Sequence, residues 1–127
     1  MTRCKTVVVH KLPESVSTDH VQDILREVLP SLEEDRPCLV FDFADARKID
    51  SAGIDMLLRC MEEAMKRNGD VKLAAVSPQI TVMLEITRVA RLFETFDKPS
   101  DAIESFHHFP FQAFRQAVTP NKDGVTA

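Results

Sequence analysis

The residues best suited to chemistry stand together in the segment Ile49-Asp50-Ser51-Ala52-Gly53-Ile54. Ser51 carries a hydroxyl that could attack a substrate or accept a phosphoryl group, and Asp50 and Asp55 flank it. Nucleophilic catalysis needs a base beside the nucleophile, but no histidine is near Ser51 and there is no Gly-x-Ser-x-Gly elbow. The chain's three glycines also form neither a Gly-x-Gly-x-x-Gly motif nor a P-loop. We therefore predict no catalytic residue and no enzyme activity.

Four aspartates around this segment could in principle gather a metal ion, since hard cations prefer carboxylate oxygens. They are Asp42, Asp45, Asp50 and Asp55. Their spacing matches no metal-binding motif, and such residues more often cap helices or lie in solvated loops. The sequence predicts no metal site and no cofactor.

The elements on either side of Ser51 determine where its hydroxyl can lie. Residues 38–43 form a short apolar run that predicts a buried strand. After the serine, apolar residues repeat with helical spacing up to the stop at Asn68-Gly69. These residues are Ile54, Leu57, Leu58, Met61 and Met65. Ser51 is therefore predicted as the N-cap of a helix, close to unpaired backbone N–H groups and the positive end of the helix dipole.

The rest of the chain alternates strands with helices. We predict strands over residues 6–10, 71–76 and 92–96, and helices over 19–32, 78–87 and 99–106. Ser17 or Thr18 is predicted to cap the first helix, and residues 13–18 to form a connector. The helix after Ser77-Pro78 should bury Ile80, Met83, Leu84 and Thr87. This alternation indicates an α/β fold with a mainly parallel sheet.

Length and composition limit the functional classes. A chain of 127 residues suggests one domain, and its net charge of −4 argues against nucleic-acid binding. No apolar run approaches the roughly 20 residues of a membrane span, and the N-terminus lacks a signal-peptide pattern. Three widely spaced cysteines indicate reduced, inert thiols and a cytoplasmic location. Six phenylalanines between residues 93 and 114 either fold back over the core or form an exposed docking patch.

Phosphorylation of Ser51 would change the charge around it strongly. Between residues 42 and 55, the four aspartates and two bases, Arg47 and Lys48, give a balance of −2. A phosphate adds about −1.5 to −2 at neutral pH. The helix N-terminus would offset part of this charge for the folded chain, whereas a bound partner would meet new repulsion. Ser51 is thus either a simple helix cap or the switch of a binding protein.

The order of these segments resembles a STAS domain, and in particular the bacterial anti-sigma factor antagonists. The resemblance extends over roughly residues 6–106. It rests on residues 40–43, Asp50-Ser51-Ala52-Gly53, Asn68-Gly69, residues 71–76, Ser77-Pro78, Met83-Leu84-Glu85, Leu92-Phe93, Phe96-Asp97 and Asp101-Ala102-Ile103. It implies one STAS-like domain over residues 1–109, with a four- or five-stranded, mostly parallel or mixed sheet flanked by about four helices. Residues 110–127 would form a partly disordered extension.

In the antagonists, the serine that matches Ser51 is phosphorylated by an anti-sigma factor that is also an ATP-dependent kinase. The unphosphorylated form binds that partner, the phosphorylated form releases it, and a PP2C-type phosphatase resets the cycle. The resemblance implies the same phosphoprotein role in bacterial transcription regulation here, and it allows a homodimer. It places the partner-binding surface on the exposed side of helix 52–67 and at Asp42, Asp50, Ser51, Ala52, Gly53, Ile54 and Asp55, with Gly53 admitting a close partner backbone.

Two departures from the family pattern bear on this site. Asp55 stands where a small residue is usual, and Arg88 replaces a glycine, so that turn should differ. The alternative function is a STAS assembly module that is never phosphorylated, for example one associated with a membrane transporter. A small-molecule sensor or hydrolase that uses the acidic pocket around Ser51 ranks last.

Overall fold

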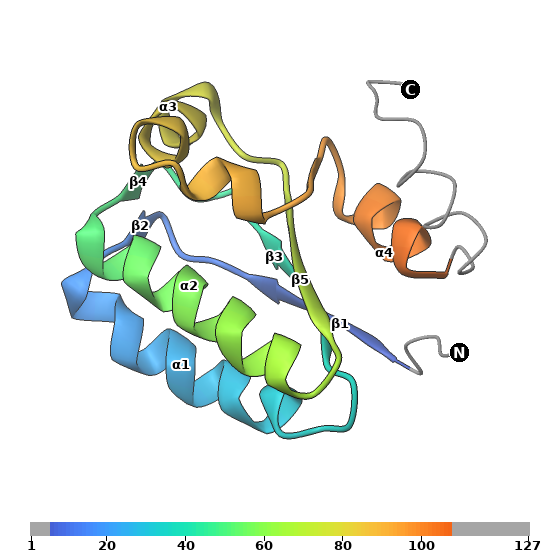
Figure 1. Ribbon diagram of the computed structural model, residues 1–127. Helices are drawn as coiled ribbons and strands as arrows, with labels where there is room; N and C mark the ends of the chain where they lie inside the picture. The colour runs from blue at the N-terminus through green and yellow to red at the C-terminus, as the bar shows by residue number, and fades with distance from the viewer. Residues whose placement is uncertain (1–5, 108–127) are drawn as a thin grey trace.

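A parallel sheet with helices on both faces forms the centre of the molecule (Figure 1). The computed structural model describes residues 6–107. The strands are β1 Val7–Lys11, β2 Ser15–Val16, β3 Cys38–Asp42, β4 Lys48–Ile49, β5 Asp70–Ala74 and β6 Thr95–Phe96. The helices are α1 Thr18–Leu32, α2 Ser51–Lys66, α3 Pro78–Ile86 and α4 Pro99–His107, with the 3₁₀ helix η1 at Val89–Leu92.

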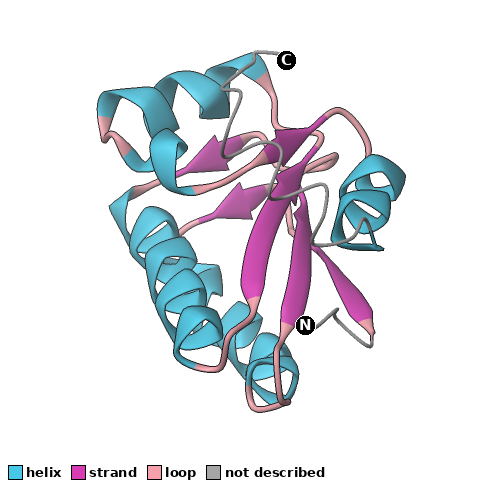
Figure 2. Cartoon of the chain, turned by 45° about the vertical axis from the view of Figure 1, so that its right-hand side comes forward, coloured by secondary structure: helices cyan, strands magenta, loops and turns pink. Residues whose placement is uncertain are grey.

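The main sheet has four parallel strands in the order β1-β3-β5-β6. Helices α1 and α2 cover one face and α4 covers the other, as Figure 2 shows from the side. Every strand-to-strand connection within this sheet contains a helix, as parallel pairing requires. The predicted α/β class and mainly parallel sheet are confirmed.

A second, two-stranded sheet joins β2 to β4 and was not predicted. Strand β2 lies inside residues 13–18, which the sequence indicated as a connector. Strands of two residues are too short to show an alternating pattern. The pair has a clear effect on the fold, because β2 leads into α1 and β4 leads into α2. The two helices therefore start side by side.

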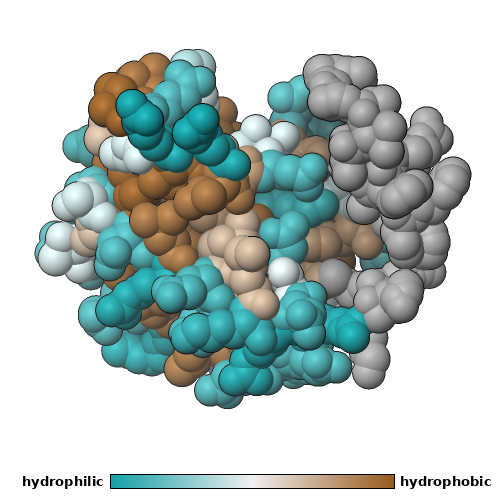
Figure 3. Space-filling model, in the orientation of Figure 1, coloured by the Kyte–Doolittle hydropathy of each residue, from teal (hydrophilic) through white to brown (hydrophobic). Residues whose placement is uncertain are grey.

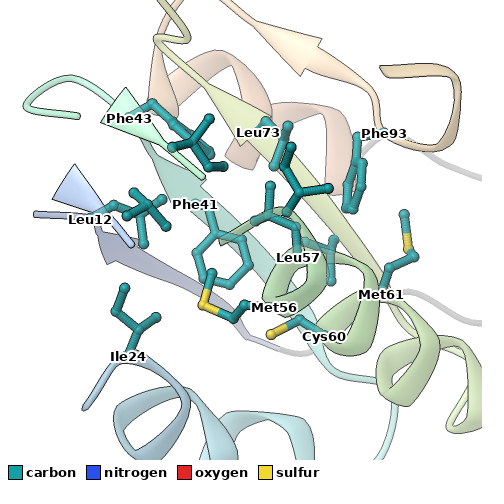
Figure 4. Close-up of a cluster of buried hydrophobic side chains, with 14 of the residues drawn as sticks. Leu12, Ile24, Phe41, Phe43, Met56, Leu57, Cys60, Met61, Leu73 and Phe93 are labelled. Atoms are coloured by element: carbon teal, nitrogen blue, oxygen red, sulfur yellow. The ribbon is translucent and has the colours of Figure 1, made fainter. Parts of the chain in front are cut away.

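The larger core lies between the sheet and the pair α1–α2. Figure 4 shows Phe41 from β3 facing Met56 and Leu57 of α2. Two predictions of burial for the helix after Ser77-Pro78 are wrong: Met83 is 38% exposed, and Thr87 is exposed as well. Met65, on the apolar face predicted for α2, is 63% exposed. Helix α3 contacts the core only through Ile80 and Leu84, so the apolar residues on its other faces lie in solvent.

A smaller core on the opposite face of the sheet lies under α4. Its unexpected member is Lys72, which is only 7% exposed although it is charged. The Nζ atom of Lys72 lies 3.0 Å from the Glu94 carboxylate and 2.7 Å from the Ser105 hydroxyl. It also stands 4.3 Å from the centre of the Phe106 ring. Lys72 thus joins β5 to α4 through contacts that satisfy its charge.

The segment after α3 differs in part from the prediction. The strand expected over residues 92–96 is limited to β6, and η1 precedes it. Arg88 adopts a φ of 66°, the left-handed conformation that glycine accepts without strain. The turn at Arg88 therefore uses a backbone conformation that usually favours glycine.

The remaining sequence predictions have mixed outcomes. Cys38 is disulfide-bonded, so the expectation of reduced thiols is wrong for this residue. Cys60 is free and buried, and burial raises the pKa of its thiol to about 12. Phe106 is buried. The phenylalanines beyond it and the predicted extension 110–127 lie outside the described residues.

Candidate functional site

Asp50, rather than Ser51, is the N-cap of α2. One carboxylate oxygen of Asp50 accepts a hydrogen bond from the backbone N–H of Gly53 at 3.0 Å. The other accepts from the backbone N–H of Thr18 at 3.2 Å and from the Thr18 hydroxyl at 3.4 Å. These bonds favour the ionised carboxylate and, with the Gly53 N–H foremost, lower the pKa of Asp50 below its ordinary value. Asp50 therefore connects the start of α2 to the start of α1.

Ser51 is consequently the first residue of the helix, and the prediction that it caps α2 is wrong. Its side chain is exposed. Within residues 6–107 its hydroxyl makes no hydrogen bond, in contrast to the Ser77 hydroxyl, which caps α3 by accepting from the backbone N–H of Ile80 at 3.3 Å. The Ser51 hydroxyl thus lies at the positive end of a 16-residue helix without a structural task among the described residues.

Gly53 faces the interior of the chain. A Cβ atom at this position would lie 2.3 Å from the carbonyl oxygen of Val16 and 2.7 Å from Cγ1 of Ile49. The close approach that requires glycine is therefore made by β2 and β4 of the same chain, not by a partner backbone as we expected. Ile54 is buried as well. Neither residue offers its side chain to a partner, whereas Asp55 is exposed and Ala52 is half-buried.

The nearby aspartates are held separately. Asp42 ends β3 and accepts a hydrogen bond from the backbone N–H of Ala44 at 2.9 Å. Asp45 lies 3.4 Å from Lys11, and Asp55 lies 3.8 Å from Arg59 on the next turn of α2. Across residues 6–107, no three His, Cys, Asp or Glu side chains gather in a group that could hold a metal ion. The structure thus shows local turns and ion pairs in place of one acidic cluster.

Beside Asp50 lies a cavity of about 460 Å³ between β4 and α3. Arg47, Lys48 and Met83 contribute to its wall. Basic side chains and an apolar one therefore border the acidic start of α2. Both bases are evident in the sequence, whereas the position of α3 next to them comes only from the fold.

Exposed apolar side chains continue from this cavity along α3. Ile86 is 70% exposed and Val82 is 51% exposed, and Leu92 of η1 is similarly open to solvent. Figure 3 shows hydrophobic surface over α3 and in the region where η1 meets α2. Exposed apolar areas of this kind mark protein interaction surfaces. The signal is present in the sequence, because the nine residues of α3 include more large apolar side chains than one buried face can hold. These side chains are Ile80, Val82, Met83, Leu84 and Ile86.

No helix within the described range 6–107 has the length and apolar character needed to cross a membrane.

Comparisons with known proteins agree on one family. The family model for the STAS domain matches residues 1–102, and no curated protein matches this chain. The structure is similar to that of a Thermotoga maritima protein assigned as an anti-sigma factor antagonist, with a TM-score of 0.74, 16% identity, and coverage of 84% of this chain and 92% of that one.

Two further solved structures represent two kinds of STAS protein. The Bacillus cell fate determinant SpoIIAA in its phosphorylated form has a TM-score of 0.62 and 17% identity, covering 83% of this chain and 95% of that one. A sulfate transporter family protein from Wolinella succinogenes has a TM-score of 0.69 and 20% identity, and the similarity covers 83% of this chain and 88% of that one. These TM-scores show a shared fold, and the family model covers most of the sequence. The chain belongs to the STAS domain family.

Proposed function

We propose that this protein is a partner-switching regulator of the anti-sigma factor antagonist type. In this proposal it binds a kinase-type anti-sigma factor while Ser51 is unmodified, and it is released when the kinase phosphorylates Ser51. A PP2C-type phosphatase returns it to the binding form. The supporting relatives are the antagonists among the similar structures, one of them solved in a phosphorylated form.

The observation that carries the proposal is the division of roles between Asp50 and Ser51. Asp50 caps the helix, so the exposed Ser51 hydroxyl is available for modification without loss of the cap. A phosphate on the first helical residue would lie at the helix N-terminus, where backbone N–H groups and the dipole favour an anion. The fold can therefore accept the phosphate, whereas a partner pressed against it would meet a doubly charged group.

The exposed surface around Ser51 supports a protein as the ligand. Val82, Met83 and Ile86 of α3 give it an apolar area, and Met83 also lines the cavity beside Asp50. Interfaces commonly combine such an apolar centre with a polar rim. The proposed contact surface thus extends from Asp42, Asp50, Ser51, Ala52 and Asp55 to α3.

Tandem mass spectrometry of the protein from its native host tests the proposal directly. We expect phosphate on Ser51 under some growth conditions in the presence of phosphatase inhibitors, and none in Ser51→Ala. Ser100→Ala is the matched control, because Ser100 is also an exposed serine in the first turn of a helix, α4. An unmodified Ser51 under all conditions, or equal modification of Ser100, contradicts the switch.

A second candidate is an assembly module that works without phosphorylation. Transporter-associated STAS domains among the similar structures favour it, including one from Vibrio cholerae with a TM-score of 0.65. The same apolar surface on α3 would then bind its partner protein regardless of the phosphorylation state of Ser51. The two candidates differ in one measurement: partner binding that is unaffected by Ser51→Asp supports the assembly module.

A further inference from the structure

A groove of about 680 Å³ runs between α1 and α2, which lie side by side in both views of the chain. Leu25, Leu29 and Leu32 of α1 and Cys60 of α2 are among the residues that line it. Leu29 is 51% exposed, whereas Leu32 and Cys60 are buried at its base. A concave, largely apolar site of this volume falls in the range of small-molecule sites, about 300–1,000 Å³.

Two arginines, one from each helix, line this groove at the same level. Thr18 bonds to Asp50 at the start of the helix pair, and the Arg67 guanidinium donates to the Glu33 carbonyl at the other end. These bonds join residues 32 and 34 positions apart. Helices α1 and α2 therefore run in the same direction, and residues about 33 positions apart lie at the same level. Arg26 of α1 and Arg59 of α2 are such a pair, and both line the groove.

Both arginines can contribute to a new ion pair. Arg26 lies 3.0 Å from Asp23, and Arg59 lies 3.8 Å from Asp55, each on its own helix. All four side chains are well exposed, and exposed pairs of this kind contribute little stability. A carboxylate between the two guanidiniums could accept hydrogen bonds from both helices at once.

The rest of the groove limits the shape and direction of a ligand. From the arginine level, Leu29 and Leu32 continue toward the C-terminal end of α1, and Glu62 and Glu63 lie on the α2 wall. The carboxylates of Glu62 and Glu63 repel an anion at that end. Cys60 is the only apolar residue that α2 contributes, so the apolar strip is narrow. It suits an unbranched chain better than a docked helix, which is about 10 Å across.

We propose that this groove binds a free single-chain amphiphile with an anionic head, of the long-chain carboxylate class. Its carboxylate lies between Arg26 and Arg59, and its hydrocarbon chain covers Leu29 and Leu32. This binding site is separate from Ser51 and does not depend on the partner-switching function.

Titration of the full chain with monomeric dodecanoate, followed by ¹H–¹⁵N NMR and calorimetry, tests the site. We expect saturable binding with shift changes in α1 and α2. Arg26→Gln with Arg59→Gln should weaken it at least tenfold, since a charge-assisted hydrogen bond contributes roughly 1.5–3 kcal/mol and about 1.4 kcal/mol is tenfold. Dodecyltrimethylammonium has the same chain and the opposite charge, and it should bind at least about tenfold more weakly for the same reason.

Leu29→Ser and Leu92→Ser form a matched pair, because the two leucines are 51% and 54% exposed but only Leu29 lines the groove. We expect Leu29→Ser alone to weaken binding. All the altered side chains are exposed, so retained dispersion in the NMR spectrum will show that each variant is folded. Equal affinity for the two amphiphiles, equal loss in both leucine variants, absence of saturable binding, or binding only to anionic lipid vesicles each overturns the proposal.

Discussion

Asp50 and Ser51 are adjacent, yet the fold gives them different tasks. Both residue types are good N-caps, so local sequence alone could not decide between them. The decision comes from α1, because the backbone N–H and hydroxyl of Thr18 donate to the same carboxylate that caps α2. Thr18 is 32 positions away in the chain. A contact at this separation is invisible to a pattern of neighbouring residues, and it leaves the serine exposed.

Ser51→Asp should reduce partner binding at least tenfold with little effect on the fold. A carboxylate in the first turn interacts favourably with the helix dipole, and exposed substitutions of this kind usually change the free energy of unfolding by no more than about 0.5 kcal/mol. Urea denaturation measures the stability, and co-purification from the native host measures binding. Ser100→Asp is the control and should keep the partner.

Asp50→Asn should lower the melting temperature at neutral pH by an amount that shrinks in acid. The folded state lowers the pKa of Asp50 below its ordinary value of 3.8. Its stabilising effect is therefore complete above that value and is lost as the pH falls through the folded pKa. Thermal melts of wild type and variant from neutral to strongly acidic pH will measure the difference. A difference in melting temperature that stays constant down to the lowest pH would contradict the stabilising role of the Asp50 carboxylate. The variant Asp55→Asn controls for the loss of a nearby surface charge.

At the scale of elements, the two-residue strands β2 and β4 have an effect out of proportion to their length. Their pairing places Val16 directly against Gly53, and Asp50 donates its backbone N–H to the Val16 carbonyl at 3.2 Å. The start of α2 is thus fixed from the β2 side as well as by its cap. This is the structural reason for glycine at position 53.

Gly53→Ala should destabilise the protein by about 1–3 kcal/mol, the usual cost of forcing extra atoms into a packed site. The added Cβ would meet a backbone oxygen at 2.3 Å, which a side-chain rotation cannot relieve. Chemical denaturation gives the free energy of unfolding. Asp55→Ala, an exposed change two positions later on α2, should stay within about 0.5 kcal/mol. If Gly53→Ala left the free energy of unfolding unchanged, β2 would be able to move away from the added Cβ without cost.

The sequence predicted the long elements better than the short ones. Helix α2 has enough residues to show its period, β3 is a continuous apolar run, and the family motifs indicate the order of the two elements. Strands β2 and β4 are too short to show a pattern, and the burial of α3 was overestimated because periodicity cannot tell how many neighbours a helix has. Helical spacing predicted Met83 on the buried face of α3 and Met65 on the apolar face of α2, yet both are exposed. Lys72 is the opposite case, because it is buried although its charge gives no indication of burial in the sequence.

At the scale of the whole molecule, the sheet separates two cores of unequal size. The core under α1 and α2 includes most of the buried residues, whereas the one under α4 is a small group that includes Val40, Ala74, Ala102 and Phe106. Lys72 supplements this small core with polar contacts and a long aliphatic stem.

Lys72→Met should change the free energy of unfolding by no more than about 1 kcal/mol, because replacing a buried ion pair with an apolar residue of similar size is often neutral. Lys72→Ala should cost about 2–4 kcal/mol, because it leaves a cavity under Phe106. Urea denaturation of both variants provides the comparison. Equal losses of stability in Lys72→Met and Lys72→Ala would show that the charge of Lys72, and not the packing of its aliphatic stem, stabilises α4.

The unequal cores imply that the molecule does not open as one unit. Helix α4 buries only a small group of apolar residues against the sheet. Its amides should therefore exchange with deuterium through a local opening. The central amides of β3 and β5 should exchange only on global unfolding. Native-state hydrogen exchange would resolve the two classes, and Lys72→Ala should speed exchange in α4 more than in β3. Helix α4 and the small core beneath it would then be a separate cooperative unit, which can unfold locally while the region around Ser51 stays folded.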